Sequence, residues 1–285
     1  MNTLELQNVT YRYGEGTPFE TTALSDISVS FSPGRITGII GQTGSGKSTL
    51  CQLLNGILLP TSGKVLLNGE EVGKNKKELL RVRSRVGLVF QYPEYQLFEE
   101  SVEKDIAFGP KNLGKTEEEI RALVREACRF AGIGEELLKT SPFDLSGGQK
   151  RRVAIAGVMA MDPEILVLDE PAAGLDPAGR EEIFGGLRAY QKEKQRTVLL
   201  ISHSMEDMAR YADEVLILKD GKKFAHDSVQ AVFENPALIR EAGLELPQIT
   251  RLMLLLSERG VPVSGASHTV QDAFLQIRAA WKGGV

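Results

Sequence analysis

One short stretch constrains the fold more than any other part of this chain: GQTGSGKST, from Gly41 to Thr49. It fits the pattern G-x-x-x-x-G-K-[ST], follows the apolar run GRITGII and precedes residues with helical spacing. The glycines let backbone N–H groups converge on phosphate oxygens, and the following helix adds partial positive charge at its N-terminus. The alternative is a tight strand-to-helix turn without a ligand, but such a turn does not require the Lys47-Ser48 pair. We therefore expect a nucleotide-phosphate site on an α/β fold.

Two residues of this loop have specific expected roles. Lys47 should reach the β- and γ-phosphates of the nucleotide, and the Ser48 hydroxyl should bind Mg²⁺. The candidate nucleotide-binding residues of the loop are Gly41, Gln42, Thr43, Gly44, Ser45, Gly46, Lys47, Ser48 and Thr49.

A pair of carboxylates ends a second apolar run, ILVLDE, at Asp169 and Glu170. A strand buried on both faces delivers its terminal side chains to the nucleotide edge of a parallel sheet. Asp169 then suits the acid that holds Mg²⁺, and Glu170 is placed to polarise an attacking water. Acids also favour the first turn of a helix, so a pair of capping residues is the alternative interpretation.

A second glycine turn lies far downstream, in LSGGQKRRVAIAG, and opens another helix. Ser146, Gly147 and Gly148 are the residue types that expose backbone N–H groups at a helix start, so this turn is a second candidate anion site. An ordinary helix start with a basic, solvated face is the alternative. One nucleotide loop does not explain why the chain carries both turns.

Composition excludes some classes of protein. The chain has 285 residues, 42% of them hydrophobic, which is enough for a sizeable core. Its formal net charge of -4 argues against sequence-independent nucleic-acid binding. Cys51 and Cys128 have no zinc-site spacing and suit a reducing cytosol. No signal-peptide pattern and no apolar run of about 18 residues is present, so we expect membrane contact only through a partner.

Hydrophobic periodicity and turn residues predict alternating strands and helices. The expected strands are residues 3–13, 23–31, 34–40, 85–91, 164–171 and 197–203, with a hairpin over 63–72 around Asn68-Gly69 and a strand-turn-strand over 213–225. The expected helices are residues 44–58, 115–139, 147–163 and 179–194, followed by helical stretches over 228–243, 247–260 and 269–281. His226 and His268 match no motif, and we expect both at the surface.

The second glycine turn resembles the LSGGQ signature of ATP-binding-cassette (ABC) ATPases, and further motifs follow that family's order between Leu4 and Ala225. The matching positions are Tyr13 for the adenine-stacking aromatic, Gln91 for the Q-loop, Ser146, Gly147, Gly148 and Gln149 for the signature, Asp176 in AGLDP for the D-loop, and His203 for the switch histidine. By this resemblance Gln91 joins Ser48 and Asp169 around Mg²⁺. Glu170 and His203 become the catalytic residues, with His203 holding the γ-phosphate of ATP.

The resemblance also implies a fold and a partner. The fold class is α/β, a P-loop NTPase of ABC type with a RecA-like core, an antiparallel β subdomain and a helical subdomain at about 92–160. The ATPase domain spans 1–227, and a C-terminal helical region, 228–285, contributes to dimerisation. In this family the signature of one subunit caps the ATP of another, so a second ABC ATPase subunit is required.

The segment Phe90–Gly114 is similar to ATPase subunits of energy-coupling-factor (ECF) importers of vitamins and metal ions. The stretches YRYGEGTPFETTALSDIS, residues 11–28, and LSGGQKRRVAIAGVMAMDPEILVLDEPAAGLDP, residues 145–177, look like the second of the two ATPase types found there. This implies a paralogous ATPase partner, a transmembrane coupling protein, indirect contact with substrate-binding membrane proteins, and a peripheral place on the cytoplasmic face of the membrane. Another ABC transporter class and a soluble, non-transport ABC ATPase are the alternative functions.

An apolar cluster with acidic residues around it lies in this segment and suits docking of a basic-tipped helix. The apolar residues are Tyr92, Pro93, Tyr95, Leu97 and Phe98, and the acids are Glu94, Glu99 and Glu100. We expect Glu94 and Glu99 to serve assembly and not ATP hydrolysis. Packing of Tyr95 and Phe98 inside the protein is the alternative.

Overall fold

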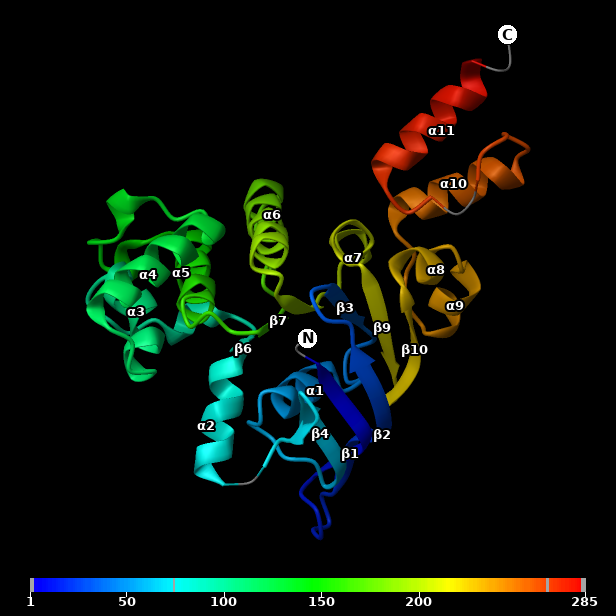
Figure 1. Cartoon of the computed structure of the whole chain (residues 1–285). Coiled ribbons are helices and arrows are strands. Elements are labelled where there is room, and N and C mark those ends of the chain that lie inside the picture. The colour runs from blue at the N-terminus through cyan, green and yellow to red at the C-terminus, as the bar shows by residue number, and fades with distance from the viewer. Residues whose placement is uncertain (1–2, 74, 265–266, 283–285) are drawn as a thin grey trace.

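The computed structural model describes residues 3–73, 75–264 and 267–282, and two sheets form its framework (Figure 1). A six-stranded sheet has the order β10-β9-β3-β8-β7-β6, and a four-stranded antiparallel sheet has the order β2-β1-β4-β5. The strands are β1 Leu4–Tyr13, β2 Thr21–Phe31, β3 Ile36–Ile40, β4 Ser62–Leu67, β5 Glu70–Glu71, β6 Val86–Val89, β7 Ile165–Asp169, β8 Thr197–Ile201, β9 Glu214–Lys219 and β10 Lys222–Ser228.

The six-stranded sheet is parallel except for β10. Its central strands are apolar at almost every position because both faces are covered. Successive side chains alternate between two cores. Ile39 and Leu216 face the four-stranded sheet and the helix after β3, whereas Ile40 and Ile217 face the remaining helices.

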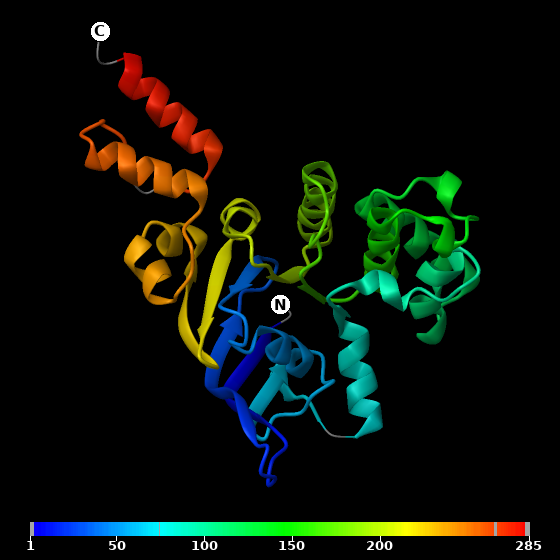
Figure 2. The ribbon, with the colours of Figure 1, turned by 180° about the vertical axis from the view of Figure 1, so that it is seen from behind.

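Helices cover the six-stranded sheet and extend the chain beyond it (Figure 2). The α-helices are α1 Lys47–Leu54, α2 Lys76–Arg85, α3 Val102–Asn112, α4 Glu117–Ala131, α5 Gly147–Met159, α6 Pro177–Lys194, α7 Met205–Tyr211, α8 Val229–Phe233, α9 Pro236–Glu241, α10 Gln248–Glu258 and α11 Val270–Lys282, and the short 3₁₀ helices are η1 Pro93–Gln96, η2 Glu135–Leu137 and η3 Pro142–Asp144.

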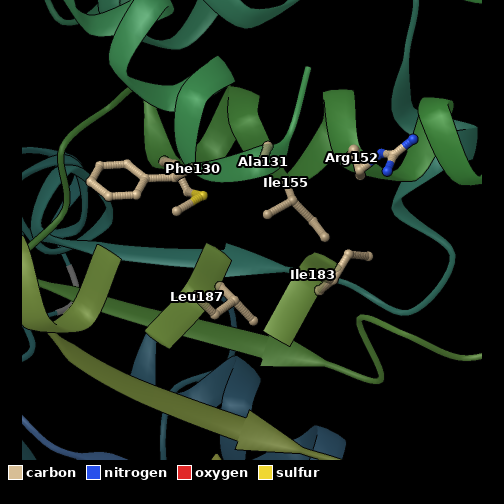
Figure 3. Close-up of a pocket in the computed structure, with 7 residues that line it drawn as sticks. Phe130, Ala131, Arg152, Ile155, Ile183 and Leu187 are labelled. Carbon is tan, nitrogen blue, oxygen red and sulfur yellow. The ribbon is translucent and has the colours of Figure 1, made fainter. Parts of the chain in front are cut away.

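Helices α3, α4 and α5 form a separate group between β6 and β7, which we call the helical lobe (η1 to α5, residues 93–159). The lobe meets the sheet layer at α6. Ile155 of α5 faces Ile183 and Leu187 of α6 across an apolar seam (Figure 3). The seam contains a small void of about 10 Å³, which has room for about one water molecule. Gly186 permits the closest approach, because a Cβ there would lie 1.9 Å from the Phe130 carbonyl oxygen.

The C-terminal helices lie at the opposite side of the sheet from the helical lobe (Figures 1 and 2). Helices α8 and α9 pack beside β9 and β10, while α10 and α11 pair with each other farther out. Among the described helices, none has the length and apolar character needed to cross a bilayer.

Several predicted elements differ from the structure. The helix expected over 115–139 ends at Ala131, because Gly132 adopts the left-handed conformation that terminates helices. The helix expected over 228–243 divides into α8 and α9, because Asn235 caps a new helix that starts at Pro236. Helices α2, α3 and α7 were not among the expected elements. The hairpin at Asn68-Gly69 is confirmed, with both residues at positive φ.

A buried carboxylate joins the two sheets near the start of β9. Glu214 accepts hydrogen bonds from the Ser32 hydroxyl at 2.7 Å and the Thr37 hydroxyl at 2.7 Å. The His226 imidazole lies 3.5 Å from the same carboxylate and is largely buried. The expectation that His226 is a surface residue is therefore wrong, because β10 turns its side chain towards Glu214. Burial alone raises the pKa of Glu214, but the nearby His226 imidazole and hydrogen bonds from Thr37 and Ser32 outweigh it and lower the pKa to about 2.

Replacing this carboxylate should change how stability depends on pH. A lowered folded-state pKa contributes stability above the unfolded value, and this contribution disappears as pH falls towards the folded value. Glu214→Gln should therefore reduce the free energy of unfolding by roughly 1–3 kcal/mol at neutral pH, with a smaller loss near pH 3. Urea unfolding at both pH values checks this, with the exposed Glu71→Gln as control. A loss of equal size at both pH values would contradict the assigned cause.

Candidate functional site

The glycine-rich loop connects β3 to α1 at the carboxyl end of the parallel strands. Gly46 has φ 97°, and a Cβ at this position would lie 2.5 Å from the Leu24 side chain. A glycine is therefore required where the loop passes β2. The Lys47 ammonium group is buried and donates to the carbonyl oxygens of Gly41 at 2.7 Å and Gln42 at 2.9 Å. Burial lowers the pKa of Lys47, and the nearby carboxylates of Glu170 and Asp169 oppose this shift.

Asp169 reaches the loop from the end of β7. Its Oδ2 accepts a hydrogen bond from the Ser48 hydroxyl at 2.7 Å. Asp169 pairs with Ile201 of β8 in the parallel register, so β7 and β8 end at the same edge. Hydroxyl and carboxylate oxygens are the ligands that Mg²⁺ prefers. The structure thus brings together two of the residues that the sequence predicted as Mg²⁺ ligands.

Glu170 is the strained and poorly solvated acid of the site. Its backbone has φ 52°, a conformation that costs a non-glycine residue free energy and often occurs at functional positions. The residue is 8% exposed, and its Oε1 has no hydrogen-bond partner among the described residues. The His203 Nε2 lies 3.3 Å from this oxygen. Burial, with the charge of Asp169, raises the pKa of Glu170 to about 7, and burial lowers the pKa of His203.

One open cleft of about 570 Å³ contains most of the predicted site. Its lining residues are Tyr13, Thr21, Thr22, Ala23, Thr43, Gly44, Gly46, Lys47, Ser48, Thr49, Gln91, Asp169, Glu170 and His203. We call it the nucleotide cleft. The Tyr13 hydroxyl lies 3.1 Å from the Thr49 hydroxyl. This hydrogen bond holds the aromatic ring at the mouth of the cleft.

Sequence reasoning missed three residues of this cleft, Thr21, Thr22 and Ala23. The available signal was strand register, because Tyr13 of β1 pairs with Thr21 of β2. Three residues of the glycine-rich loop do not line the cleft. Gly41 and Ser45 are buried, and the Gln42 side chain donates to the Gly243 carbonyl oxygen at 2.9 Å instead of pointing into the cleft.

Two of the four signature residues, Ser146 and Gly148, line a different cleft of about 490 Å³ between the start of α5 and the start of α6, whereas Gly147 and Gln149 do not line it. Ser146 caps α5 by accepting from the Gln149 backbone N–H, and the Gln149 side chain accepts from the Ser146 N–H. Asp176 likewise caps α6 through the Gly179 N–H at 2.7 Å. We call this the signature cleft. Among the residues that line the two clefts, none belongs to both.

The segment after Gln91 exposes its aromatic side chains. Tyr95 is 84% exposed and Phe98 is 56% exposed, so neither packs inside the protein. Phe98 forms an edge-to-face contact with Phe108 of α3, an exposed ring that sequence analysis did not include. Pro93 is buried, and Leu97 packs against the core.

Glu94 does not belong to the acidic rim that the sequence predicted. Its carboxylate forms a two-point ion pair with Arg151, at 3.0 and 2.7 Å, and the Arg151 side chain is almost completely buried. Charge reversal at Glu94 would leave a buried arginine unpaired, so we now expect it to disturb the helical lobe as well as assembly.

Comparison with known proteins places these features in a family. The ABC transporter family model matches residues 24–173. The energy-coupling factor transporter ATP-binding protein EcfA2 of Caldanaerobacter subterraneus subsp. tengcongensis is 50% identical over 270 residues, which cover 95% of this chain and 94% of that protein. This chain belongs to the ATP-binding proteins of energy-coupling factor transporters.

Solved structures agree with that family and with the fold. The structure of cbiO1 from Clostridium perfringens, described as part of the ABC transporter complex cbiONQ, is 40% identical, with a TM-score of 0.76 over 88% of this chain and 98% of that chain. An ATP-binding cassette solved as a dimer in a post-hydrolysis state with ADP and Pi is 29% identical, with a TM-score of 0.71 over 79% of this chain and 98% of that chain. The predicted ABC-type α/β fold is confirmed, and this ECF family member is an ATPase.

Replacing Lys47 tests the glycine-rich loop of this ECF ATPase. Lys47→Ala removes the main side-chain counterion for the phosphates, so ATP affinity should fall by about ten- to a hundred-fold. Equilibrium titration with ATP measures the change, and Lys76→Ala on the exposed surface of α2 is the control. Unaltered affinity would remove Lys47 from phosphate binding.

Replacing Glu170 separates binding from chemistry. Glu170→Gln keeps the shape of the side chain but cannot accept a proton, so ATP should still bind while turnover falls by roughly 10²–10⁴-fold. Steady-state hydrolysis together with ATP titration checks both parts, and Glu118→Gln at the exposed start of α4 is the control. Turnover close to that of the unchanged protein would exclude Glu170 as the catalytic acid-base group.

Proposed function

We propose that this chain is the motor subunit of an ECF-type importer, which hydrolyses MgATP to energise uptake of vitamins or metal ions through a membrane coupling protein. The separation of the nucleotide cleft from the signature cleft carries the proposal. Each cleft holds half of the residues that the family uses around one ATP. A second ABC ATPase subunit must therefore supply its signature to the nucleotide cleft of this chain.

The residues of the nucleotide cleft have distinct proposed roles. Backbone N–H groups of the glycine-rich loop and Lys47 bind the phosphates, and Tyr13 stacks on the adenine. Ser48, Asp169 and Gln91 would hold Mg²⁺, which when bound neutralises charge on the phosphate oxygens. The short Ser48–Asp169 contact supports this assignment, because it already brings two oxygen ligands together.

Hydrolysis depends on Glu170 and His203 in this proposal. Glu170 orients a water and accepts its proton, and a pKa near 7 suits a base that works at neutral pH. His203, 3.3 Å from the Glu170 carboxylate, is placed to contact the γ-phosphate. The signature residues of this chain, with Asp176, act on the ATP held by the second subunit. The Gln149 side chain takes part indirectly, because it accepts from the Ser146 N–H and thereby fixes the helix start that faces the phosphate.

The second ATPase subunit is proposed to be a paralogue, because this chain resembles one of the two ATPase types of ECF importers. The two ATP sites of such a pair of subunits would then be unequal. The C-terminal region, 228–285, is proposed to add to the contact between the subunits, although residues 265, 266 and 283–285 lie outside the described part. Exposed apolar side chains on α10 and α11 support this proposal: Leu252, Leu255, Val270, Phe274, Leu275 and Trp281.

The exposed aromatic residues after Gln91 are the proposed docking surface for the membrane coupling protein. We call this surface the aromatic patch: Tyr92, Tyr95, Phe98 and Phe108. Large rings beside Glu99 and Glu100 suit an apolar helix with a basic tip. The complex would hold this chain at the cytoplasmic face of the membrane, in contact with substrate-binding membrane proteins only through the coupling protein and with no nucleic-acid partner.

Capture of the complex tests the proposed function. The tagged chain, purified from detergent-solubilised native membranes, should bring with it a related ATPase and one transmembrane coupling protein, with small membrane proteins in lesser amounts. Mass spectrometry identifies them. A single dedicated permease pair would assign the chain to another transporter class, and absence of any membrane protein would favour a soluble ABC ATPase.

The same capture tests the docking surface. Glu99→Lys places a repelling charge beside the aromatic patch and should reduce recovery of the coupling protein, while ATP hydrolysis by the ATPase pair persists. Glu118→Lys makes the same change of charge on α4 of the same lobe and should leave recovery unchanged. Equal recovery with both variants would contradict the proposed surface.

A further inference from the structure

Arg151 is a buried charged residue in α5, five positions after the signature serine. It is 3% exposed. Its Nε donates to one oxygen of Glu94 at 3.0 Å and its Nη2 to the other at 2.7 Å, while its Nη1 donates to the carbonyl oxygen of Ala173. The guanidinium carbon also lies 5.8 Å from the centre of the Tyr92 ring.

These contacts join three segments that are far apart in the sequence. Glu94 lies in η1, between Tyr92 and Tyr95 of the aromatic patch in the sequence. Arg151 belongs to the helix that the signature begins. Ala173 lies three residues after the catalytic Glu170 and begins the D-loop, whose last residues start α6. One guanidinium group is thus bonded to the docking segment and to the catalytic segment, and is itself part of the signature helix.

The shape of the arginine side chain gives this contact a defined geometry. A guanidinium group presents a planar fork that fits both oxygens of a carboxylate, whereas a lysine ammonium group is a point charge without that geometry. Because the Arg151 side chain is only 4% exposed, removal of Glu94 would leave its charge buried and uncompensated. A displacement of η1 therefore moves Glu94 and Arg151 together.

We propose that Arg151 is a positioning residue that makes the placement of the signature helix and of the D-loop depend on the placement of η1. This inference rests on the proposed function, because it requires a membrane partner that contacts the aromatic patch. Docking fixes η1, the Glu94–Arg151 pair fixes the start of α5, and the Ala173 contact fixes the chain that follows Glu170. Hydrolysis is thereby tied to the presence of the membrane partner.

A second arginine–glutamate pair, between the lobe and α6, serves as a control. Arg129 of α4 forms a two-point ion pair with Glu193 of α6, at 3.1 and 2.7 Å. Both side chains are about half exposed, so solvent screens this pair. The pair joins the lobe to the sheet layer but touches neither η1 nor the D-loop.

The experiment uses the complex of this chain with its partner ATPase and the coupling protein, reconstituted in vesicles. Arg151→Lys is compared with Arg129→Lys and with the unchanged protein. We expect Arg151→Lys to assemble normally and to keep its KM for ATP, while kcat of the assembled complex falls by about ten- to a hundred-fold, because small misplacements of catalytic groups have effects of that size. Transport per ATP hydrolysed should fall as well. Arg129→Lys should change none of these quantities more than about two-fold.

A further variant, Glu94→Gln, covers the case in which Arg151→Lys fails to fold. Glu94→Gln keeps the shape of the partner and the Ala173 contact but removes the ionic fork, and it should lower kcat and transport per ATP in the same direction without changing KM. Values of kcat and coupling for the folded variants that match those of Arg129→Lys would overturn the inference. Failure of the unchanged chain to assemble with any membrane protein would instead overturn the proposed function.

Discussion

The parallel register of β3, β8 and β7 is the constraint on which the nucleotide cleft depends. Because the three strands end at one edge, the loop after β3 places Lys47 and Ser48 beside Asp169 at the end of β7. Glu170 follows β7 directly, and His203 follows β8. The apolar strands beneath exclude water from the floor of the cleft. The low exposure that results lowers the pKa of Lys47 and raises that of Glu170, so strand register and site electrostatics have one common cause.

The helical lobe holds the rest of the machinery away from that cleft. Its attachment at α6 is close, as the Gly186 contact with Phe130 shows, and its signature lines a cleft of its own. A single copy therefore carries two halves of different sites. Under the proposed function, this arrangement explains why the sequence has two glycine turns. The Glu94–Arg151 pair is then the proposed link between the docking surface and the signature helix.

Sequence reasoning succeeded where a motif carries its own local geometry. The glycine-rich loop, the acid pair after β7 and the Asn68-Gly69 hairpin are short-range features whose backbone requirements appear in the residues themselves. It failed where a side chain finds a partner far along the chain. Glu94 looked like a surface acid among exposed rings, and His226 matched no motif, yet both face buried groups of opposite charge or polarity.

The sequence by itself determined the family, the nucleotide loop and the order of the catalytic motifs, because these depend on residue types at fixed local spacing. Only the tertiary structure decided that the signature lines a separate cleft, that Glu170 is strained and poorly solvated, and that Arg151 joins η1 to the D-loop. Burial, pKa and long-range pairing are properties of how distant segments pack together. No local pattern of residues contains that information.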